Sequence, residues 1–416
     1  MSFKNYIDGM EKISNIDIKH LAEQFGTPLY VYDYEIIKNN YSKLKSAFDK
    51  YYPNNTIHYS VKANSNIHIL RIFKELGCGA DCSSPFELYL ADLSGFTNDK
   101  ILYTGNYESN DDLAEASKYN VKINVDDISS FKRLLKIKLP EIISFRINPG
   151  IGRGGFEGIV TAGSDAKFGV PYEQAFEAYK MAKDAGVSRF GIHMMTGSNN
   201  LEPYYFAEVV DKLLTITGSV FTKLGIVPEY IDIGGGFGIP YDDDEEELNI
   251  DDTARLVAET LHEKCKKYNF GEPELKMEPG RYLIGNAGFL ISKVTGIKNS
   301  YKRFVGIDAG MNVLIRPALY GARHRIKIYG KEERKNFYYV CGQICENSDI
   351  MASHVYLPEV NEGDIAIILD VGAYGFSMSS NYNNRLRPAE ILIQNENIHL
   401  IRARESYEDL LRLTKL

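Results

Sequence analysis

The sequence lacks most of the features that mark secreted, metal-binding or membrane proteins. Its 416 residues include five cysteines, an odd number without any Cys-x-x-Cys pair. Neither a disulfide framework nor a structural zinc site is therefore indicated. No apolar run approaches the roughly 20 residues that span a bilayer, and the N-terminal segment lacks the apolar core of a signal peptide. We expect a cytoplasmic protein with no metal and no membrane contact.

A block of basic residues is also missing. The net charge is −8, from 48 basic and 56 acidic residues, which argues against nucleic acid as the main partner. Apolar residues make up 44% of the chain and charged residues 25%, as in globular domains. The length predicts two domains and leaves room for one of them to be a large barrel.

Short apolar segments alternate with amphipathic helical segments between Asp33 and Arg281. Several of the helical segments end at a glycine, which accepts positive φ at little cost. Eight strand–helix units predict a (β/α)₈ TIM-type barrel. The expected strands are His58–Ala63, Gly79–Ser83, Lys100–Thr104, Val121–Val125, Ile142–Ile147, Phe190–Met194, Tyr230–Ile233 and Leu275–Glu278.

Strands without long helices between them follow residue 285, and they predict a second, all-β domain. They are Gly288–Thr295, Phe304–Ile307, His324–Ile328, Asn336–Val340, Ile365–Leu369 and Glu390–Gln394. Pro28–Val31 is a further strand, placed before the barrel begins. We therefore predict an α/β fold with a barrel over residues 30–284 and a β domain built from 1–29 and 285–416. The acidic run Asp242–Glu247 indicates a solvated loop more than a metal site.

Polar residues gather where the barrel strands are expected to end. Active sites of such barrels lie at the C-terminal ends of the strands. Lys62 lies at the C-terminal end of the first strand, where its amine can be held in a cleft, as a Schiff-base lysine requires. The other candidates at these ends are Asp81, Arg146, Asn148, His193, Ser198, Gly234–Gly236 and Glu278–Arg281.

Two of these candidates have both a structural and a functional interpretation. Gly234–Gly236 is either a tight turn or a cradle whose backbone amides bind a phosphate, and its place after strand seven favours the cradle. Glu278 either pairs with Arg281 or sets its carboxylate against a protonated ring nitrogen. Together with Lys62, the cradle and the carboxylate suggest pyridoxal phosphate.

The β domain has polar clusters of its own, around Arg316–Gly321, Cys341–Asp349 and Gly372–Gly375. A buried cysteine is usually a small apolar residue. Cys345 stands beside Glu346 in a loop with glycine and asparagine, which makes it a better candidate for an acid or a nucleophile.

These motifs resemble fold-type III pyridoxal-phosphate decarboxylases and, within that group, the diaminopimelate decarboxylase family. The resemblance covers roughly Gly26 to Leu411. The segments that carry it are Tyr59–Asn64, Gly234–Gly236, Glu278–Arg281, Arg316–Gly321, Cys345–Glu346 and Gly372–Pro388.

The resemblance implies that Lys62 carries pyridoxal 5'-phosphate as a Schiff base. Ser198, Gly235 and Gly236 would bind the cofactor phosphate, and Glu278 would pair with the pyridine nitrogen. The further cofactor-binding residues that it implies are Asp81, His193, Gly280, Arg281 and Tyr374, the last from the partner subunit and also in contact with substrate.

The resemblance also implies a substrate site shared between two subunits of a homodimer. Arg281, Arg316 and Tyr320 would hold the distal carboxylate, and Glu346 would meet the distal amino group. Cys345, contributed across the dimer interface, would protonate the carbon after carbon dioxide leaves. An arginine fork suits a carboxylate, which fits a substrate with a carboxylate at both ends.

Two departures from the family pattern stand out. The family usually has His-x-His on strand six, where the second histidine stacks on the cofactor ring, but this chain has His193-Met194-Met195. A thioether can also pack against a ring face. In the cysteine loop, Gln343 replaces the usual proline, and Asn347-Ser348 replaces the usual serine and glycine. Cys345 and Glu346 are retained.

We therefore expect a carboxy-lyase that converts meso-2,6-diaminopimelate to L-lysine and carbon dioxide, the last step of lysine biosynthesis. A sister decarboxylase for ornithine, lysine, arginine or a carrier-linked amino acid would leave Arg316 without a carboxylate. An amino-acid racemase would require two catalytic bases on opposite sides of the substrate, commonly lysine and tyrosine. A cofactor-binding protein without turnover would resemble a lone barrel. A barrel enzyme unrelated to pyridoxal phosphate would lack a visible chromophore.

Overall fold

The computed structural model describes residues 10–150, 162–163 and 165–415. These residues form two compact units. The barrel unit covers the described residues from Asn40 to Pro240 and from Glu246 to Leu283. The sheet unit covers the described residues up to Asn39, the segment 241–245 and the described residues from Ile284 onward.

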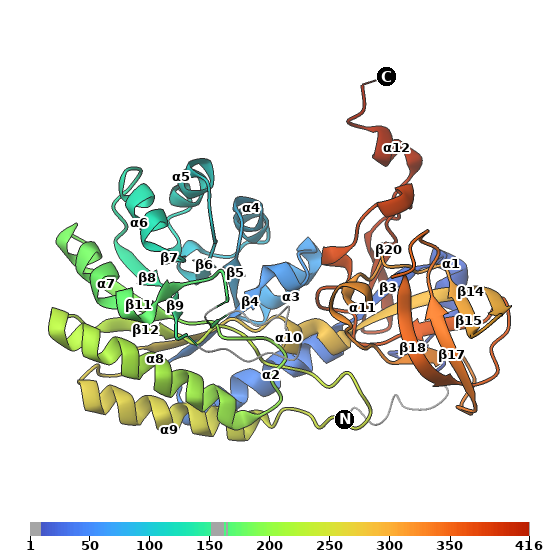
Figure 1. Cartoon of the computed structure of the whole chain (residues 1–416), viewed down its shortest axis with the longest axis horizontal. Coiled ribbons are helices and arrows are strands. Elements are labelled where there is room, and N and C mark those ends of the chain that lie inside the picture. Colours follow the sequence, from blue (N-terminus) through green and yellow to red (C-terminus); the bar gives the residue numbers. More distant parts are fainter. Residues whose placement is uncertain (1–9, 151–161, 164, 416) are drawn as a thin grey trace. The chain divides into compact units, whose positions relative to one another are not determined.

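A closed barrel of eight parallel strands forms the centre of the barrel unit, as the sequence predicts (Figure 1). Neighbouring strands follow the chain order around the barrel, and β13 closes it by pairing with β4. The strands are β4 (Asn55–Ser60), β5 (Gly79–Cys82), β6 (Ile101–Tyr103), β7 (Lys122–Val125), β8 (Ile142–Phe145), β11 (Arg189–His193), β12 (Pro228–Asp232) and β13 (Glu274–Met277).

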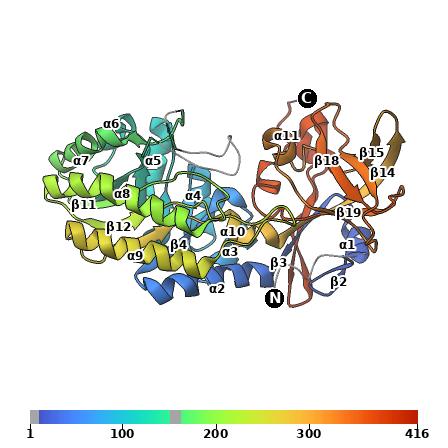
Figure 2. The ribbon, with the colours of Figure 1, turned by 60° about the horizontal axis from the view of Figure 1, so that its bottom comes forward.

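Helices cover the outside of the barrel (Figures 1 and 2). They are α2 (Tyr34–Tyr51), α3 (Ile67–Glu75), α4 (Pro85–Leu93), α5 (Asn110–Lys118), α6 (Ile128–Leu135), α7 (Ala175–Asp184), α8 (Pro203–Leu224) and α9 (Ile250–Tyr268). Lys50 near the end of α2 pairs with Asp251 at the start of α9 over 2.9 Å, so these helices lie side by side. Gly77, Gly95 and Gly186 follow α3, α4 and α7 with φ of +92°, +87° and +99°. These glycines end the helices where the sequence predicts.

Two barrel strands end more than one residue before the predicted position. The first ends at Ser60, and the 3₁₀ turn Val61–Ala63 carries Lys62. The fifth ends at Phe145, and β9 (Ile147–Asn148) instead pairs with β10 (Val170–Pro171). The chain leaves the barrel here because the Arg146 carbonyl accepts a hydrogen bond from the Val170 N–H at 2.8 Å.

A mixed sheet forms the centre of the sheet unit. Its main path runs β18-β17-β15-β14-β3-β20-β21, and β19 pairs with both β14 and β16. The strands are β3 (Leu29–Asp33), β14 (Gly288–Asn299), β15 (Arg303–Ile307), β16 (Ile326–Ile328), β17 (Asn336–Cys341), β18 (Ile350–Leu357), β19 (Ile365–Ile368), β20 (Ala389–Gln394) and β21 (Asn397–Arg402).

The N-terminal strand β3 lies inside this sheet, antiparallel to β14 and parallel to β20. Its five residues are all buried. By contrast, β18 and β21 have mostly partly or fully exposed residues. The sequence analysis missed both, because a strand with little apolar alternation gives a weak signal.

Short elements complete the described chain. They are β1 (Lys12–Ile13), β2 (Ile16–Asp17), α1 (Ile18–Phe25), α10 (Arg281–Ile284), α11 (Arg316–Tyr320) and α12 (Tyr407–Leu411). No helix in the part of the chain that the structure describes is both long and apolar enough to cross a membrane.

Candidate active site

Lys62 directly follows β4, and its amine pairs with the carboxylate of Asp81 on the neighbouring strand β5. The distance from Nζ to Oδ2 is 2.5 Å, and the Ser60 hydroxyl donates to the same Oδ2 at 3.1 Å. The Asp81 side chain is fully buried, whereas that of Lys62 is 43% exposed. Asp81 therefore orients an amine that stays accessible. Asp81 Oδ1 has no hydrogen-bond partner among the described residues.

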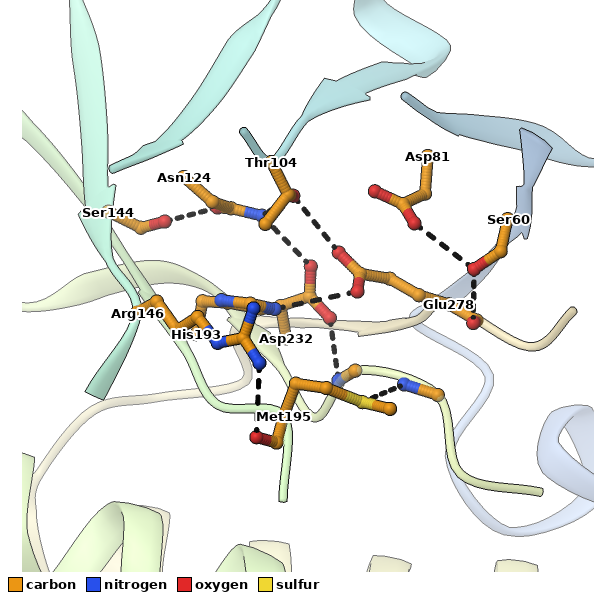
Figure 3. Close-up of polar contacts among 12 residues, drawn as sticks. Ser60, Asp81, Thr104, Asn124, Ser144, Arg146, His193, Met195, Asp232 and Glu278 are labelled. Carbon is orange, nitrogen blue, oxygen red and sulfur yellow. Dashed lines mark hydrogen bonds and ion pairs between the residues drawn. The ribbon is translucent and has the colours of Figure 1, made fainter. Parts of the chain in front are cut away.

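Three buried side chains meet between β11, β12 and the segment after β13 (Figure 3). One side-chain atom from each of His193, Asp232 and Glu278 lies within 4.8 Å of the others. His193 Nε2 is 3.5 Å from Glu278 Oε2, and Asp232 shares a hydrogen bond with Glu278. Two carboxyl groups and an imidazole thus occupy one interior site.

The two carboxyl groups of this cluster divide into one neutral and one charged group. Burial, together with the charge of Glu278, raises the pKa of Asp232 well above its ordinary value. Burial also acts to raise the pKa of Glu278, but His193, Lys62 and the hydrogen bond from Asp232 outweigh it and lower this pKa to about 2. Close carboxylates cannot both ionise cheaply. Burial and proximity therefore favour a single proton shared within this pair.

A polar network from three barrel strands supports this pair (Figure 3). Asn124 Nδ2 donates to Thr104 Oγ1 at 3.0 Å and lies 3.5 Å from Asp232 Oδ2. The Tyr230 hydroxyl donates to Asn124 Oδ1 at 3.1 Å. The Thr104 hydroxyl in turn lies 3.4 Å from Glu278 Oε1. Because these groups are anchored on strands, the carboxyl pair has a rigid base.

The glycine turn after β12 packs too closely for side chains. A Cβ on Gly235 would lie 2.5 Å from the Glu278 carbonyl oxygen, and one on Gly234 would lie 2.8 Å from the Met194 carbonyl oxygen. Gly234 and Gly236 also have φ of +68° and +95°. The Gly234 N–H donates to Asp232 Oδ1 at 2.9 Å. The turn is thus held directly against the carboxyl pair.

Met195 and Ser198 lie in the segment after β11. The Gly235 N–H donates to Met195 Sδ at 3.2 Å. Arg281 is buried, and its Nη2 lies 3.3 Å from Ser198 Oγ. Gly280 is buried immediately before Arg281. The segment after β11 therefore borders both the glycine turn and Arg281.

The predicted substrate-binding residues other than Arg281 belong to the sheet unit, where Arg316 is almost fully buried. Arg316 is 1% exposed, its Nη1 lies 2.8 Å from His324 Nε2, and its guanidinium lies 4.8 Å from the Tyr241 ring centroid. His324 Nδ1 lies 2.9 Å from the Leu369 carbonyl oxygen. Since a carbonyl only accepts, Nδ1 carries the hydrogen and Nε2 accepts from Arg316.

The cysteine loop and two tyrosines complete the sheet unit's predicted residues. Cys345 and Glu346 are exposed, and the Cys345 N–H donates to Asn383 Oδ1 at 2.9 Å. Tyr320 ends α11 and is partly exposed. Tyr374 is also partly exposed, with a φ of +58°.

The barrel residues fit pyridoxal phosphate. Lys62 offers an accessible amine, Glu278 a buried anion for a protonated ring nitrogen, and the glycine turn a backbone without side chains. The Gly235 N–H is engaged by a sulfur atom, which is a weak acceptor that a phosphate oxygen can replace.

Comparison with known proteins shows the family of this chain. Residues 37–285 match the family model "Pyridoxal-dependent decarboxylase, pyridoxal binding domain". The chain belongs to this family. It is 44% identical to the diaminopimelate decarboxylase of Methanothermobacter thermautotrophicus, over 96% of this chain and 94% of that protein. Its cofactor is therefore pyridoxal phosphate.

Solved structures agree with the fold of this decarboxylase. The diaminopimelate decarboxylase of M. jannaschii, in complex with L-lysine, is 35% identical with a TM-score of 0.89, covering 97% of this chain and 96% of that one. A lysine/ornithine decarboxylase from Vibrio vulnificus, with putrescine, has a TM-score of 0.78 and 23% identity, covering 91% and 98% of the two chains. That second likeness supports the fold alone.

The structure brings most of the predicted barrel residues together and adds three that the sequence analysis missed. The residues that it gathers are Lys62, Asp81, His193, Ser198, Gly235, Gly236, Glu278, Gly280 and Arg281. Asp232, Asn124 and Thr104 were missed. Asp232 had a usable signal, because it is an acid inside the apolar strand that leads into Gly234.

Proposed function

We propose that this decarboxylase converts meso-2,6-diaminopimelate to L-lysine and carbon dioxide. The observation that carries the proposal is its similarity to diaminopimelate decarboxylases through both units, at 44% identity over 96% of the chain. This similarity extends well beyond the segment 37–285 that matches the cofactor-binding family.

The barrel residues have proposed roles toward the cofactor. When bound, pyridoxal phosphate supplies a ring that accepts the electrons of the broken carbon–carbon bond. Lys62 Nζ would hold the cofactor, and Asp81 orients this lysine amine. Glu278 keeps a proton on the ring nitrogen. Gly235 and Gly236 bind the phosphate. Ser198, Gly280 and Arg281 help to bind it, as does Tyr374 of the partner subunit. His193 borders the cofactor ring.

The sheet-unit residues have proposed roles toward the substrate. Arg316 and Tyr320 bind the distal carboxylate together with Arg281, because a guanidinium fork matches two carboxylate oxygens. Glu346 meets the distal amino group, and Tyr374 also contacts the substrate. The Cys345 thiol donates a proton to the carbon that has lost carbon dioxide.

The buried Arg316 favours a dicarboxylic substrate over a diamino acid. A substrate with only an amine at its far end would bring a second positive charge toward this guanidinium instead of a carboxylate that its fork can bind. This argument separates the proposal from the alternative, a sister decarboxylase acting on ornithine, lysine, arginine or a carrier-linked amino acid.

Carbon dioxide release by the purified protein with pyridoxal phosphate tests the proposal. Meso-diaminopimelate, ornithine, lysine and arginine are compared at equal concentration. We expect release from meso-diaminopimelate alone. Faster release from any of the other three would reject the proposed substrate and favour the sister enzyme. Cofactor without enzyme is the blank.

A homodimer and a cytoplasmic location are also part of the proposal. The loop with Cys345 and Glu346 is exposed in this single chain, as expected of residues that complete a partner's site. All five cysteines are free, which suits a reducing compartment. Sedimentation tests the dimer: a monomer that retains full activity at high dilution would reject shared sites.

A further inference from the structure

Asp232 contacts two parts of the cofactor site at once. Its Oδ1 accepts the Gly234 N–H at 2.9 Å, at the start of the glycine turn. Its carboxyl group is also hydrogen-bonded to Glu278. The proposed roles set the glycine turn at the phosphate and Glu278 at the ring nitrogen. Asp232 therefore links the groups for the two ends of one ligand.

The surroundings of Asp232 disfavour a charge on it. The side chain is 0% exposed. The titratable groups that face it are Glu278 after β13, His193 on β11, Asp81 on β5 and Tyr230 on its own strand. Asn124 on β7 is a neutral neighbour at 3.5 Å. Two of these groups, Glu278 and Asp81, are carboxylic acids. The single imidazole, that of His193, lies against Glu278.

A carboxylic acid and a carboxylate can share one hydrogen bond, whereas two carboxylates cannot. The bond between Asp232 and Glu278 therefore needs one proton. If Glu278 held that proton, it could not serve as the anion for a protonated ring nitrogen. If Asp232 holds it, the acid donates to Glu278 and still accepts from Gly234.

We propose that Asp232 is a positioning residue that stays a neutral acid, donates its hydrogen to Glu278 and anchors the glycine turn through Gly234. Through one side chain it sets the charge of the ring-nitrogen partner and the position of the phosphate turn. The inference rests on the proposed cofactor roles of Glu278 and the turn. It does not depend on which amino acid the enzyme decarboxylates.

Asp232→Asn is the decisive variant, because an amide copies a neutral acid. Its NH₂ can donate to Glu278 and its oxygen can accept from Gly234. We expect the cofactor dissociation constant of Asp232→Asn to stay within about threefold of wild type. Asp232→Ala loses both hydrogen bonds, and we expect it to bind the cofactor about tenfold to a hundredfold more weakly. Dissociation constants come from visible-absorbance titration of cofactor-depleted protein.

A pH titration of the visible band of the loaded enzyme separates this role from a merely structural one. Since Asp232→Asn leaves the charge unchanged, its titration midpoint should coincide with that of wild type. A midpoint displaced by about one pH unit or more would show that Asp232 is ionised and overturn the proposal. The proposal would also be overturned if Asp232→Asn bound the cofactor as weakly as Asp232→Ala does. The same holds if neither variant bound the cofactor more weakly than wild type.

Glu108→Gln is the matched control. Glu108 is another buried barrel-unit carboxyl group, 6% exposed, but it bonds Ser130 outside the site. Its cofactor affinity and titration midpoint should equal those of wild type. Should Asp232→Ala fail to fold, the affinity and midpoint of Asp232→Asn decide alone. If the wild-type enzyme binds the cofactor normally but does not decarboxylate meso-diaminopimelate, the proposed substrate is rejected. The inference about Asp232 is not affected by that result.

Discussion

The sulfur of Met195 accepts a hydrogen bond from the Gly235 N–H at 3.2 Å. This contact ties the segment after β11 to the glycine turn after β12 (Figure 3). A thioether is a weak acceptor, so a phosphate oxygen can take over the N–H while the methyl group remains free to pack on a ring. Met195 can thus serve where the family pattern has a histidine.

We predict that Met195→His binds pyridoxal phosphate at least as tightly as wild type, because imidazole both accepts hydrogen bonds and stacks on rings. Met195→Leu keeps an apolar contact but lacks the polarizable sulfur that packs against an aromatic ring, and it should bind about twofold to fivefold more weakly. Cofactor titration measures both. Met181→Leu, on α7 outside the barrel, is the control. Tighter binding by Met195→Leu than by Met195→His would contradict the prediction.

Replacing Lys62 with alanine should remove both the visible band of bound cofactor and turnover, the latter by at least about a hundredfold. Lys62→Arg keeps a positive charge toward Asp81 but offers no nucleophilic amine, so we expect it to fail equally. Lys50→Ala removes an exposed lysine of an ion pair and should be neutral. Absorbance after gel filtration and carbon dioxide release are measured. An active Lys62→Ala variant would refute the role of this lysine.

The barrel and the lysine could be predicted because their signals are local. Short buried strands, amphipathic helices and helix-ending glycines repeat along the chain, and each follows from the properties of neighbouring residues. Strand ends were harder to predict, since the chain turns away from the barrel after Arg146. The Arg146 N–H still bonds Val125 in the barrel, but its carbonyl bonds Val170, twenty-four residues away.

The buried carboxyl pair could not be predicted as a pair. Asp232 and Glu278 are far apart in sequence, and their protonation depends on burial and on each other. The tautomer of His324 has the same origin, because Leu369 comes from a different strand segment. Sequence patterns located the residues, whereas their charges required the three-dimensional contacts.

The Cys345 thiol is proposed to act after carbon dioxide has left, so its loss should spare cofactor binding. We predict that Cys345→Ala keeps the visible band and lowers kcat by about 10² to 10⁴, the range for a general acid. Cys341→Ala, a partly buried thiol near the Val305 carbonyl, is the control and should stay near wild type. Normal kcat and clean lysine formation by Cys345→Ala would exclude this thiol.

His324 should act on the substrate's distal end through Arg316. Because Nε2 accepts from Arg316 and Nδ1 is bound to Leu369, His324→Ala frees the guanidinium to change direction. We predict a KM for meso-diaminopimelate raised about tenfold with kcat changed less, since each misplaced charged hydrogen bond weakens binding by about that factor. Steady-state kinetics measure both parameters.

Two further variants sharpen this prediction. Arg316→Lys should raise KM at least as much, because an ammonium lacks the fork. His354→Ala removes an exposed histidine of the same unit and should leave KM unchanged. A fall in kcat without a rise in KM for His324→Ala would argue against a role in holding the distal carboxylate.

A buried ion pair on β13 predicts how acid affects the stability of the fold. Lys276 is 1% exposed, and its Nζ lies 2.7 Å from Glu274 Oε2. Burial acts to raise the pKa of Glu274, but Lys276 and a hydrogen bond from Thr56 outweigh it and hold this pKa below its ordinary 4.5. The stabilisation is therefore present above about pH 4.5 and is lost as the pH falls below it.

We predict that Glu274→Gln lowers the free energy of unfolding by about 3 kcal/mol at neutral pH, because it leaves the buried Lys276 without its counter-charge. The difference should shrink on acidification, because the wild-type carboxylate then also becomes neutral. Glu229 on β12 forms an exposed ion pair with Arg189 on β11. Glu229→Gln breaks this ion pair and should lower the free energy of unfolding by only about 0.5 kcal/mol. Urea unfolding at neutral pH and at pH values below about 4.5 gives these free energies. A Glu274→Gln deficit that stays constant across this range would show that the lost interaction is not ionic.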